Sequence, residues 1–382
     1  MSVDETKNKD NTMKRIAIIF AACAALFACS PKEVSEADFN ATVDGKQVSL
    51  YTLEAGNLKM QVTNYGARVV TLWVPDKDGV REDIVLGYNN LETYLNNPGE
   101  RFLGAVVGPY ANRIADGTYS IGEDTYNFPK NNNGQTLHGG DFGLDRVVWD
   151  VDTVTANSLV LSYLHKHLQE GMPGNLQIKM TYTLTPENEF KVEYLAQTDT
   201  TTHVNISHHS FFNLKGEGNG TINDHILYIN ASLTTPVDSL LIPTGEIVPV
   251  EGTPFDFRSP KAIGQDLEIE NEQLKNGAGY DHNWVLDRVT PSDLELAASV
   301  YEPASGRYME VWTDQPALQF YGGNFFDGTT KGKYDKPLNY RESIALETQK
   351  YPDTPNHENF PSTLLNPGEV YTHTCVYRFS TK

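Results

Sequence analysis

Two titratable residues have the surroundings expected of groups that exchange protons with a substrate. In a regular strand, His208 would share its face with the apolar Val204 and Ile206. His209 would then point to the opposite, more polar face, and histidine is the side chain best suited to proton transfer near neutral pH. Glu347 ends an apolar run and is a candidate general base. Taken singly, a structural histidine and an exposed strand-end carboxylate are the commoner interpretations.

Four further segments mix polar, aromatic and glycine residues as carbohydrate sites do. Arg113, in the segment 111–114, could donate hydrogen bonds to hydroxyl groups. The glycines of segment 136–140 would let the backbone approach a ligand closely. Segments 279–284 and 315–321 interleave amides and carboxylates with aromatic rings.

These residues must be positioned by strands, because alternation with a period of two dominates the chain from about residue 39 onward. Residues 176–184 and 190–194 alternate on either side of the turn sequence at 186–189, which predicts a hairpin. Helical periodicity is confined to 91–97 and 262–267. We therefore expect an all-β fold, with residues 39–382 forming one large antiparallel domain whose loops carry the site.

The composition excludes one class of partner. The formal net charge is −20, and no cluster of Lys and Arg is present. Nucleic-acid-binding proteins need basic patches that displace counterions from phosphates, so no nucleic-acid partner is expected. The same charge disfavours phosphorylated substrates.

The N-terminus predicts export. Lys14 and Arg15 precede the apolar run 16–28, which is shorter than the ~20 residues of a membrane-spanning helix. The run ends at Cys29 in the manner of a bacterial lipoprotein signal, so residues 1–29 are predicted to be a signal segment and Cys29 a lipidation site. A plain cleaved signal is the alternative. Residues 30–38 would form a tether, and an exported, periplasmic or outer-membrane-attached lipoprotein would touch the membrane only through its anchor.

Neither a disulfide nor a metal is expected. Cys375 has no partner left once the signal is removed, and it reads as a buried strand residue. His165 and His167 could ligate a metal, but a zinc site needs three or four convergent ligands. A solvated pair of strand residues is the simpler interpretation. A structural Ca²⁺ is left open by the acidity of the chain but is not predicted.

Together and in order, the polar segments resemble the aldose 1-epimerase (galactose mutarotase) family. The resemblance runs from about residue 39 to the C-terminus and is carried by the segments 64–67, 111–114, 138–140, 209–214, 243–246, 252–257, 279–283, 318–321, 346–349, 355–357 and 360–361. It implies a β-sandwich of unusual size, called a supersandwich, with a sugar cleft on one face. The chain departs from many relatives at His208, Pro109, Met172 and Trp284, none of which is a proposed catalytic group.

The resemblance also implies roles. His209 would be the general acid and Glu347 the general base that open and reclose the ring of a free aldohexose, interconverting its α and β anomers. Sugar hydroxyls would be held by Asn112, Arg113, His138, Asp281 and Gln319. No cofactor is required, a monomer is expected, and the resting pair would consist of an imidazolium and a carboxylate.

Three other functions remain open. A sugar-binding module would use the same aromatics and amides without needing both an acid and a base. A glycoside hydrolase needs two carboxylates, for which Asp281 and Glu347 could serve. A hexose-6-phosphate epimerase would need additional Arg or Lys at the cleft.

Overall fold

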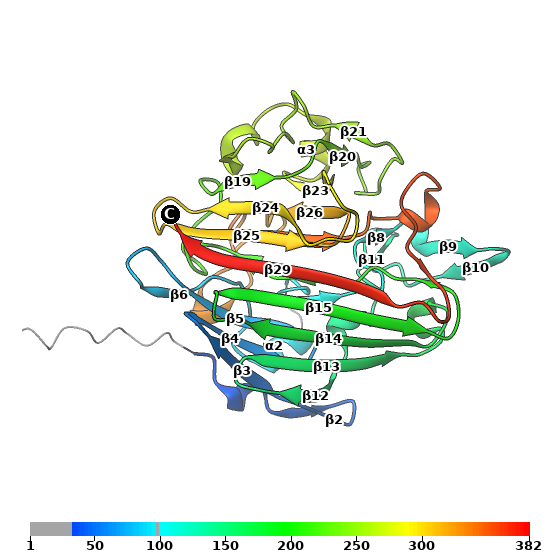
Figure 1. Cartoon of the computed structure of the whole chain (residues 1–382), viewed down its shortest axis with the longest axis horizontal. Coiled ribbons are helices and arrows are strands. Elements are labelled where there is room, and N and C mark those ends of the chain that lie inside the picture. Colours follow the sequence, from blue (N-terminus) through cyan, green and yellow to red (C-terminus); the bar gives the residue numbers. More distant parts are fainter. Residues whose placement is uncertain (1–32, 97–98) are drawn as a thin grey trace, which may run out of the picture. The chain divides into compact units, whose positions relative to one another are not determined.

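The computed structural model describes residues 33–96 and 99–382, which form one compact unit from Glu33 onward (Figure 1). The predicted signal segment and Cys29 lie outside these residues. The last residues of the predicted tether are packed against the domain. Val34 is buried, and its backbone N–H and C=O both form hydrogen bonds with the side chain of Gln61. Residues 33–38 thus belong to the domain, because an apolar residue and a paired backbone anchor them.

The largest sheet has nine antiparallel strands. Its spatial order is β12 (Asp150–Val154), β13 (Ser158–His165), β14 (Leu176–Leu184), β15 (Glu189–Thr198), β29 (Tyr371–Thr381), β25 (Arg307–Thr313), β24 (Glu295–Tyr301), β19 (Ile226–Ile229) and β22 (Lys261–Ala262). The C-terminal strand β29, red in Figure 1, crosses the middle of this sheet and joins its two halves.

Two smaller sheets pack behind it. One has six strands in the order β18 (Phe211–Phe212), β27 (Ile344–Gln349), β26 (Ala317–Tyr321), β23 (Asp281–Val285), β20 (Leu233–Thr235) and β21 (Val248–Pro249). The other has four, in the order β3 (Leu50–Ala55), β4 (Leu58–Thr63), β5 (Arg68–Pro75) and β6 (Arg81–Asp83).

Short strand pairs and helical turns complete the described residues. The pairs are β1 (Ala41–Val43) with β2 (Lys46–Val48), β7 (Ala105–Val107) with β17 (Ser207–His209), β8 (Arg113–Ile114) with β11 (Thr136–Leu137), β9 (Thr118–Ile121) with β10 (Asp124–Asn127), and β16 (Thr202–His203) with β28 (Leu364–Leu365). The α-helices are α2 (Leu91–Asn96) and α3 (Glu272–Asn276), and the 3-10 turns are η1 (Glu36–Phe39), η2 (Ala115–Gly117), η3 (Leu144–Arg146), η4 (Gln169–Gly171), η5 (Ile263–Asp266), η6 (Lys333–Asp335) and η7 (Thr354–Asn356). No helix among the described residues is both long and apolar enough to span a bilayer.

The sheets meet across a shared apolar core to which all three contribute. Polar bonds fix their alignment within that core. The hydroxyl of Thr348 in β27 lies 2.8 Å from His373 Nε2 in β29, and Tyr377 of β29 donates to the carbonyl of Leu346 at 3.2 Å. The fold is therefore mostly β, antiparallel and layered, as expected.

Most local predictions are confirmed. The hairpin predicted around 186–189 is β14–β15, whose inward residues are buried in strict alternation. Helices are found at 91–96 and, as a 3-10 turn, at 263–266. Cys375 is buried in β29 and unpaired. The interpretation of 165–167 as solvated is wrong for His165, which ends β13 with its side chain in the interior.

Candidate active site

A cleft of ≈ 390 Å³ lies where β17, β23 and β27 approach the loops around residues 100, 112, 132 and 138. Its size is typical of small-molecule sites. Six of the seven residues predicted for catalysis and sugar binding line it: Asn112, Arg113, His138, His209, Asp281 and Glu347. The seventh, Gln319, is buried behind Asp281 and does not form part of the wall.

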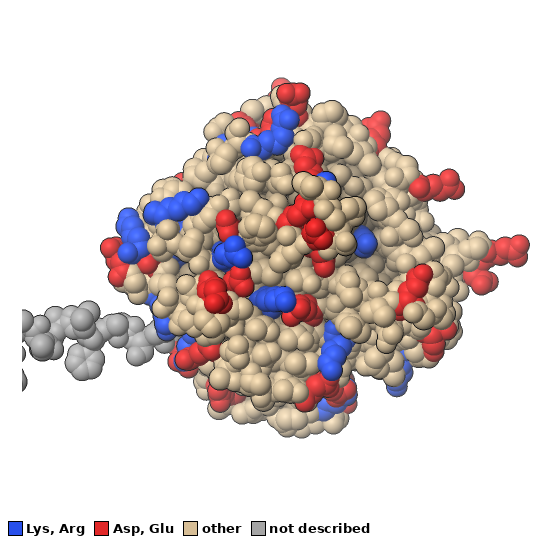
Figure 2. All heavy atoms as spheres, viewed as in Figure 1, with Lys and Arg blue, Asp and Glu red and all other residues tan. Residues whose placement is uncertain are grey.

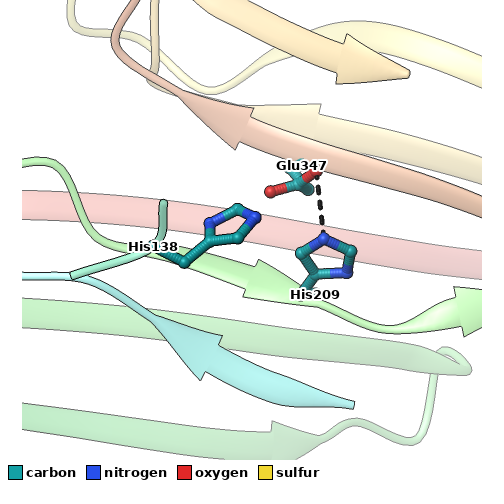
Figure 3. Close-up of side chains that lie close together, drawn as sticks. All are labelled: His138, His209 and Glu347. Carbon is teal, nitrogen blue, oxygen red and sulfur yellow. Dashed lines mark ion pairs between the residues drawn. The ribbon is translucent and has the colours of Figure 1, made fainter. Parts of the chain in front are cut away.

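His209 and Glu347 face each other in this cleft (Figure 3). Nε2 of His209 lies 3.4 Å from Oε1 of Glu347, and both side chains are almost wholly buried. The imidazole is packed between Phe102, at 5.9 Å between ring centroids, and Phe211, at 4.7 Å. These two rings restrict the imidazole to the orientation that meets the carboxylate.

The alternation argument for His209 is confirmed by its neighbour. His208 points into the core, where Nδ1 lies 3.1 Å from the hydroxyl of Tyr182 and Nε2 2.7 Å from that of Ser210. Both nitrogens are thus occupied by structural partners, which leaves His209 as the histidine available to a ligand.

Strand register places the carboxylates and amides of the site in one row. Gln319 of β26 is paired with Glu347 of β27 on one side and with Asn283 of β23 on the other. Directly opposed residues project to the same face of a sheet, and Asp281, two positions from Asn283, shares that face. The opposite face, including Phe320 and Leu346, is core. Glu347 lies within β27 and is not an exposed strand-end residue. It is buried because its strand is covered on both faces.

Asp281 is held by two donors. Gln319 Nε2 donates to its Oδ1 at 2.7 Å, and Arg113 Nη2 lies 3.5 Å from its Oδ2. Nε of Arg113 is buried and has no partner among the described residues. Asp281 therefore balances the charge of Arg113, while Nε of Arg113 stays available as a donor at the cleft.

Asn112 and His138 adjoin the paired strands β8 and β11 and are bonded to each other in the wall of the cleft. The N–H of Asn112 donates to Nδ1 of His138 at 3.1 Å, and the N–H of His138 donates to the carbonyl of Asn112 at 3.0 Å. Both residues have left-handed backbone, with φ of 64° and 51°. Such conformations are uncommon outside glycine and are found where surrounding contacts impose them, often at functional sites.

The bonds between Asn112 and His138 decide which nitrogen of the His138 ring carries its proton. Burial lowers the pKa of His138 well below its ordinary value, so the ring is neutral near pH 7. Since Nδ1 accepts a hydrogen bond, the proton of the neutral ring must sit on Nε2. The remaining nitrogen is consequently a donor.

His138, His209 and Glu347 together resemble a metal-ligand set, with ligand atoms within 4.8 Å of one another. A metal needs a lone pair from each imidazole, however. At His138 the only free nitrogen carries the proton. The donor set fits a sugar hydroxyl better than a cation.

Burial opposes both charges of the central pair. It lowers the pKa of His209 to about 4 and raises that of Glu347 well above its ordinary value, and the neighbouring Asp281 raises the Glu347 pKa further. The imidazolium and carboxylate expected of this pair are therefore opposed by burial. Withdrawal from water penalises the charged forms and favours a neutral imidazole beside a protonated Glu347.

Several cleft residues lie outside every segment that the sequence analysis singled out: Glu100, Arg101, Phe102, Asn132 and Phe325. Arg101 is anchored by a bidentate bond to the buried Asp145, at 2.7 and 2.8 Å. Most of these residues come from loops, where no periodic pattern marks the inward side chains. Tyr321, which also lines the cleft, belongs to the candidate segment 315–321 and lies two positions from Gln319 on the same strand.

Comparison with known proteins agrees with this geometry. The sequence profile of the aldose 1-epimerase family matches residues 49–378. A rat galactose mutarotase is 41% identical over 336 residues, covering 88% of this chain and 95% of its own. An Escherichia coli aldose 1-epimerase is 34% identical over 340 residues, covering 88% and 96%.

Solved structures extend the likeness to the fold. An aldose epimerase homologue from C. elegans superimposes with a TM-score of 0.80 at 29% identity, covering 87% of this chain and 99% of its own. The family expectation raised by the motifs is thereby confirmed over nearly the whole described domain. The chain belongs to the aldose 1-epimerase family.

Proposed function

We propose that the protein is a mutarotase that interconverts the α and β anomers of free aldohexoses of the glucose and galactose type. The observation that carries this proposal is the contact between the buried side chains of His209 and Glu347. Ring opening removes a proton from O1 and adds one to the ring oxygen O5. Because both oxygens are bonded to C1, an acid and a base must stand side by side, as these two do.

The chemical step needs only these groups. Glu347 accepts the O1 proton while His209 protonates O5, and the C1–O5 bond breaks to give the open-chain aldehyde. Rotation about C1–C2 presents the other face of the carbonyl, and the same two proton transfers run in reverse. Acid and base catalysis contribute ~10²–10⁴-fold each, which is sufficient for a reaction that already proceeds in water.

The proton balance of the pair supports this cycle. With one proton in total, the pair is either an imidazolium and a carboxylate or a neutral imidazole and a carboxylic acid. Burial favours the second form. A bound aldose donates its O1 hydroxyl to Glu347 and offers a lone pair of O5 to His209, which stabilises the charged form that opens the ring. After ring opening the pair is in the neutral form.

The remaining residues orient the ring. Arg113 with its partner Asp281, the Nε2–H of His138 and the side chain of Asn112 offer donors and acceptors around the cleft. Holding the sugar in one pose lowers the entropic part of the barrier.

The alternatives fit less well. A pure binding module would not need the buried His209–Glu347 pair, whose burial without full pairing disfavours folding. For a glycoside hydrolase, Asp281 would have to serve as a second catalytic carboxylate, but its oxygens face Gln319 and Arg113. For a phosphorylated hexose, the cleft arginines Arg101 and Arg113 would have to be free, yet each faces a carboxylate.

The test is the rate at which freshly dissolved α-glucose and α-galactose approach their equilibrium optical rotation. The full chain should accelerate this rate in proportion to its concentration, and the variant carrying both His209→Ala and Glu347→Ala should not. A wild-type rate equal to that of buffer would overturn the proposal, and release of a second sugar from a glycoside would favour the hydrolase instead.

We further propose that the protein is exported as a monomer and tethered at the periplasmic or outer-membrane surface by lipid on Cys29. The support is the basic pair and apolar run that precede this cysteine. Lys and Arg lie among Asp and Glu on the face shown in Figure 2 rather than gathering into one basic surface, so electrostatic attachment of that face to anionic lipid is not favoured. Detergent phase partitioning of the full chain and its Cys29→Ser variant tests the anchor. Equal partitioning into the aqueous phase would contradict it.

A further inference from the structure

The catalytic pair belongs to an alignment of two chain segments, because residues 205–212 run antiparallel to β27. In β18 this alignment is a backbone ladder, with Phe211 opposite Ala345. Continued by two positions, the same register sets His209 opposite Glu347. The acid and the base therefore face each other as a cross-strand pair, and whatever aligns the two segments also sets the distance between these groups.

The backbone ladder with β27 does not extend as far as the histidine. Among the described residues, β17 pairs with β7 instead, where Ser207 lies opposite Val107 and His209 opposite Ala105. β17 nevertheless lies beside β27. The approach of these two strands must therefore be set by side chains in place of paired backbones.

Two buried side chains bridge the strands at this point. The hydroxyl of Ser207 donates to the carbonyl of Thr348 in β27 at 2.8 Å. The amide of Asn205 bonds both backbone groups of Lys350, just beyond β27: it accepts the N–H at 2.9 Å and donates to the carbonyl at 3.4 Å. Asn205 and Ser207 are both 0% exposed, so water does not compete for these bonds.

The bridging residues alternate with the catalytic histidine. Asn205, Ser207 and His209 occupy every second position, so their side chains project to the same face. Their contacts follow one another along the facing segment, from the residue after β27 to Thr348 and then to Glu347. The contact between acid and base is thus the third in a row whose first two members are hydrogen bonds to backbone.

Asn205 also holds the segment that carries the sugar-binding residues. Its backbone N–H donates to the carbonyl of Pro109 at 2.8 Å, and its carbonyl accepts the N–H of Ala111 at 2.5 Å. Its side-chain Nδ2 donates in addition to the carbonyl of Ala111 at 3.2 Å. Ala111 directly precedes Asn112 and Arg113. Asn205 therefore joins this segment to the two strands that carry the acid and the base.

We propose that Asn205 and Ser207 are positioning residues that set the distance between His209 and Glu347. Neither lines the cleft, so each acts through the segments that it joins. The inference rests on the proposed function, because the groups that are positioned are its acid and its base. A misplacement of about 1 Å in such a pair can lower the rate on the order of a hundredfold.

The test measures kcat and KM for α-glucose by polarimetry, at temperatures where circular dichroism shows each variant to be folded. In Ser207→Ala we expect kcat to fall at least about tenfold and KM to stay within about threefold of the wild type, because misalignment weakens the transition state more than ground-state binding. Ser207→Thr keeps the hydroxyl and should restore most of kcat. Asn205→Ala should lower kcat and also raise KM, since it releases the segment before Arg113.

Thr313→Val is the matched control for Ser207→Ala. The hydroxyl of Thr313, a residue that is 0% exposed, donates to the carbonyl of Thr374 at 2.9 Å and so joins the neighbouring strands β25 and β29 away from the cleft. This variant should lower the urea midpoint about as much as Ser207→Ala does and leave kcat unchanged.

Three outcomes would overturn the inference. One is a wild-type kcat in Ser207→Ala, which decides the matter even where Asn205→Ala does not fold. Another is an equal loss of kcat in Ser207→Ala and Ser207→Thr, which would separate the loss from the hydroxyl. The third is an equal loss in Thr313→Val, which would make it a general effect of stability. In each case normal turnover by the wild type would leave the proposed function intact, whereas an inactive wild type would overturn both.

Discussion

His209 and Glu347 face each other across the cleft, with Nε2 of His209 3.4 Å from Oε1 of Glu347, and neither side chain forms another ion pair among the described residues. Nδ1 of His209 and Oε2 of Glu347 are both buried and unbonded there. Buried polar atoms left in this state destabilise a fold, which is expected where the missing partner is a ligand. The pair is thus arranged for a substrate rather than for the stability of the fold.

Removing either member of the pair should abolish most of the activity. For His209→Ala and for Glu347→Gln we expect kcat to fall by ~10²–10⁴-fold, because each proton transfer needs both groups. The double variant should be scarcely slower than either single one, since groups that act as a unit are not additive. Polarimetry on α-glucose measures this, with the exposed Glu123→Gln as control. If the losses of kcat in the two single variants multiplied in the double variant, the two residues would act independently and not as a concerted pair.

The pH dependence of kcat/KM should report the pair and not either residue alone. Burial lowers the pKa of His209 to about 4 and raises that of Glu347 above its ordinary value. A doubly protonated pair therefore loses its first proton near pH 4, from the imidazole, and its last one at the raised pKa of the carboxyl. Activity requires one proton, so kcat/KM should rise through about pH 4 and decline above the Glu347 pKa.

The alkaline decline is thus assigned to a carboxyl group, which is open to a direct check. In Glu347→Gln the residual activity should lack that decline, whereas the wild type shows it under the same buffers. Persistence of the same alkaline limb in the Gln variant would assign it to another group.

Glu347 should also lower the stability of the fold at neutral pH. A carboxyl group whose pKa is raised in the folded state contributes most to the free energy of unfolding at pH values below its unfolded pKa, near 4.5. That contribution is lost as the pH rises through the folded pKa. Glu347→Gln removes this loss, so at pH 7 we expect the free energy of unfolding to increase by roughly 0.5–2 kcal/mol. Urea titrations at pH 4 and pH 7 measure it. A gain at pH 4 as large as that at pH 7 would contradict the assignment.

Much of the scaffold was predictable from the sequence, because burial on one face leaves a period of two. That rule located the β14–β15 hairpin, and it separated His209 from His208 without reference to any relative. It failed at Glu347, which alternation alone could only describe as a strand-end carboxylate. Its burial depends on contacts with neighbouring strands, among them β17, which lies far away in the chain.

The loop residues of the cleft were beyond such rules. Phe102 is flanked by carbonyls that the distant Arg68 bonds, and Phe325 stacks on Tyr321, and neither arrangement leaves a periodic pattern in the sequence. Burial also opposes the charged pair that the sequence leads us to expect at His209 and Glu347. The sequence shows which ionisable side chains are present, but the free-energy penalty for removing their charges from water depends on the packed structure.

Activity should survive removal of divalent metals. Nδ1 of His138 accepts the N–H of Asn112, so the trio of His138, His209 and Glu347 lacks a third free lone pair. We expect unchanged kcat after dialysis against EDTA. A loss of activity restored by Zn²⁺ but not by Ca²⁺ would show instead that the trio binds a metal.

The wall that carries Phe102 should depend on a buried ion pair. Asp145 is wholly buried and holds Arg101 through two bonds, with Arg68 at 3.5 Å. Arg68 in turn donates to the carbonyls of residues 101 and 103, on either side of Phe102. Asp145→Ala would leave two guanidinium groups without their shared carboxylate, which typically costs about 3–5 kcal/mol of stability.

The same variant should weaken sugar binding, because Phe102 packs against both His138, at 4.6 Å, and His209. We therefore expect a higher KM for glucose and a lower kcat at temperatures where the variant is still folded by circular dichroism. Asp150→Ala is the matched control: it breaks the exposed pair with Lys46, at 2.8 Å, and should cost no more than about 1 kcal/mol with no kinetic effect. Equal stability losses in the two variants would show that the buried pair contributes no more than a surface one. Unchanged kinetics in Asp145→Ala would show that Phe102 is held by other contacts.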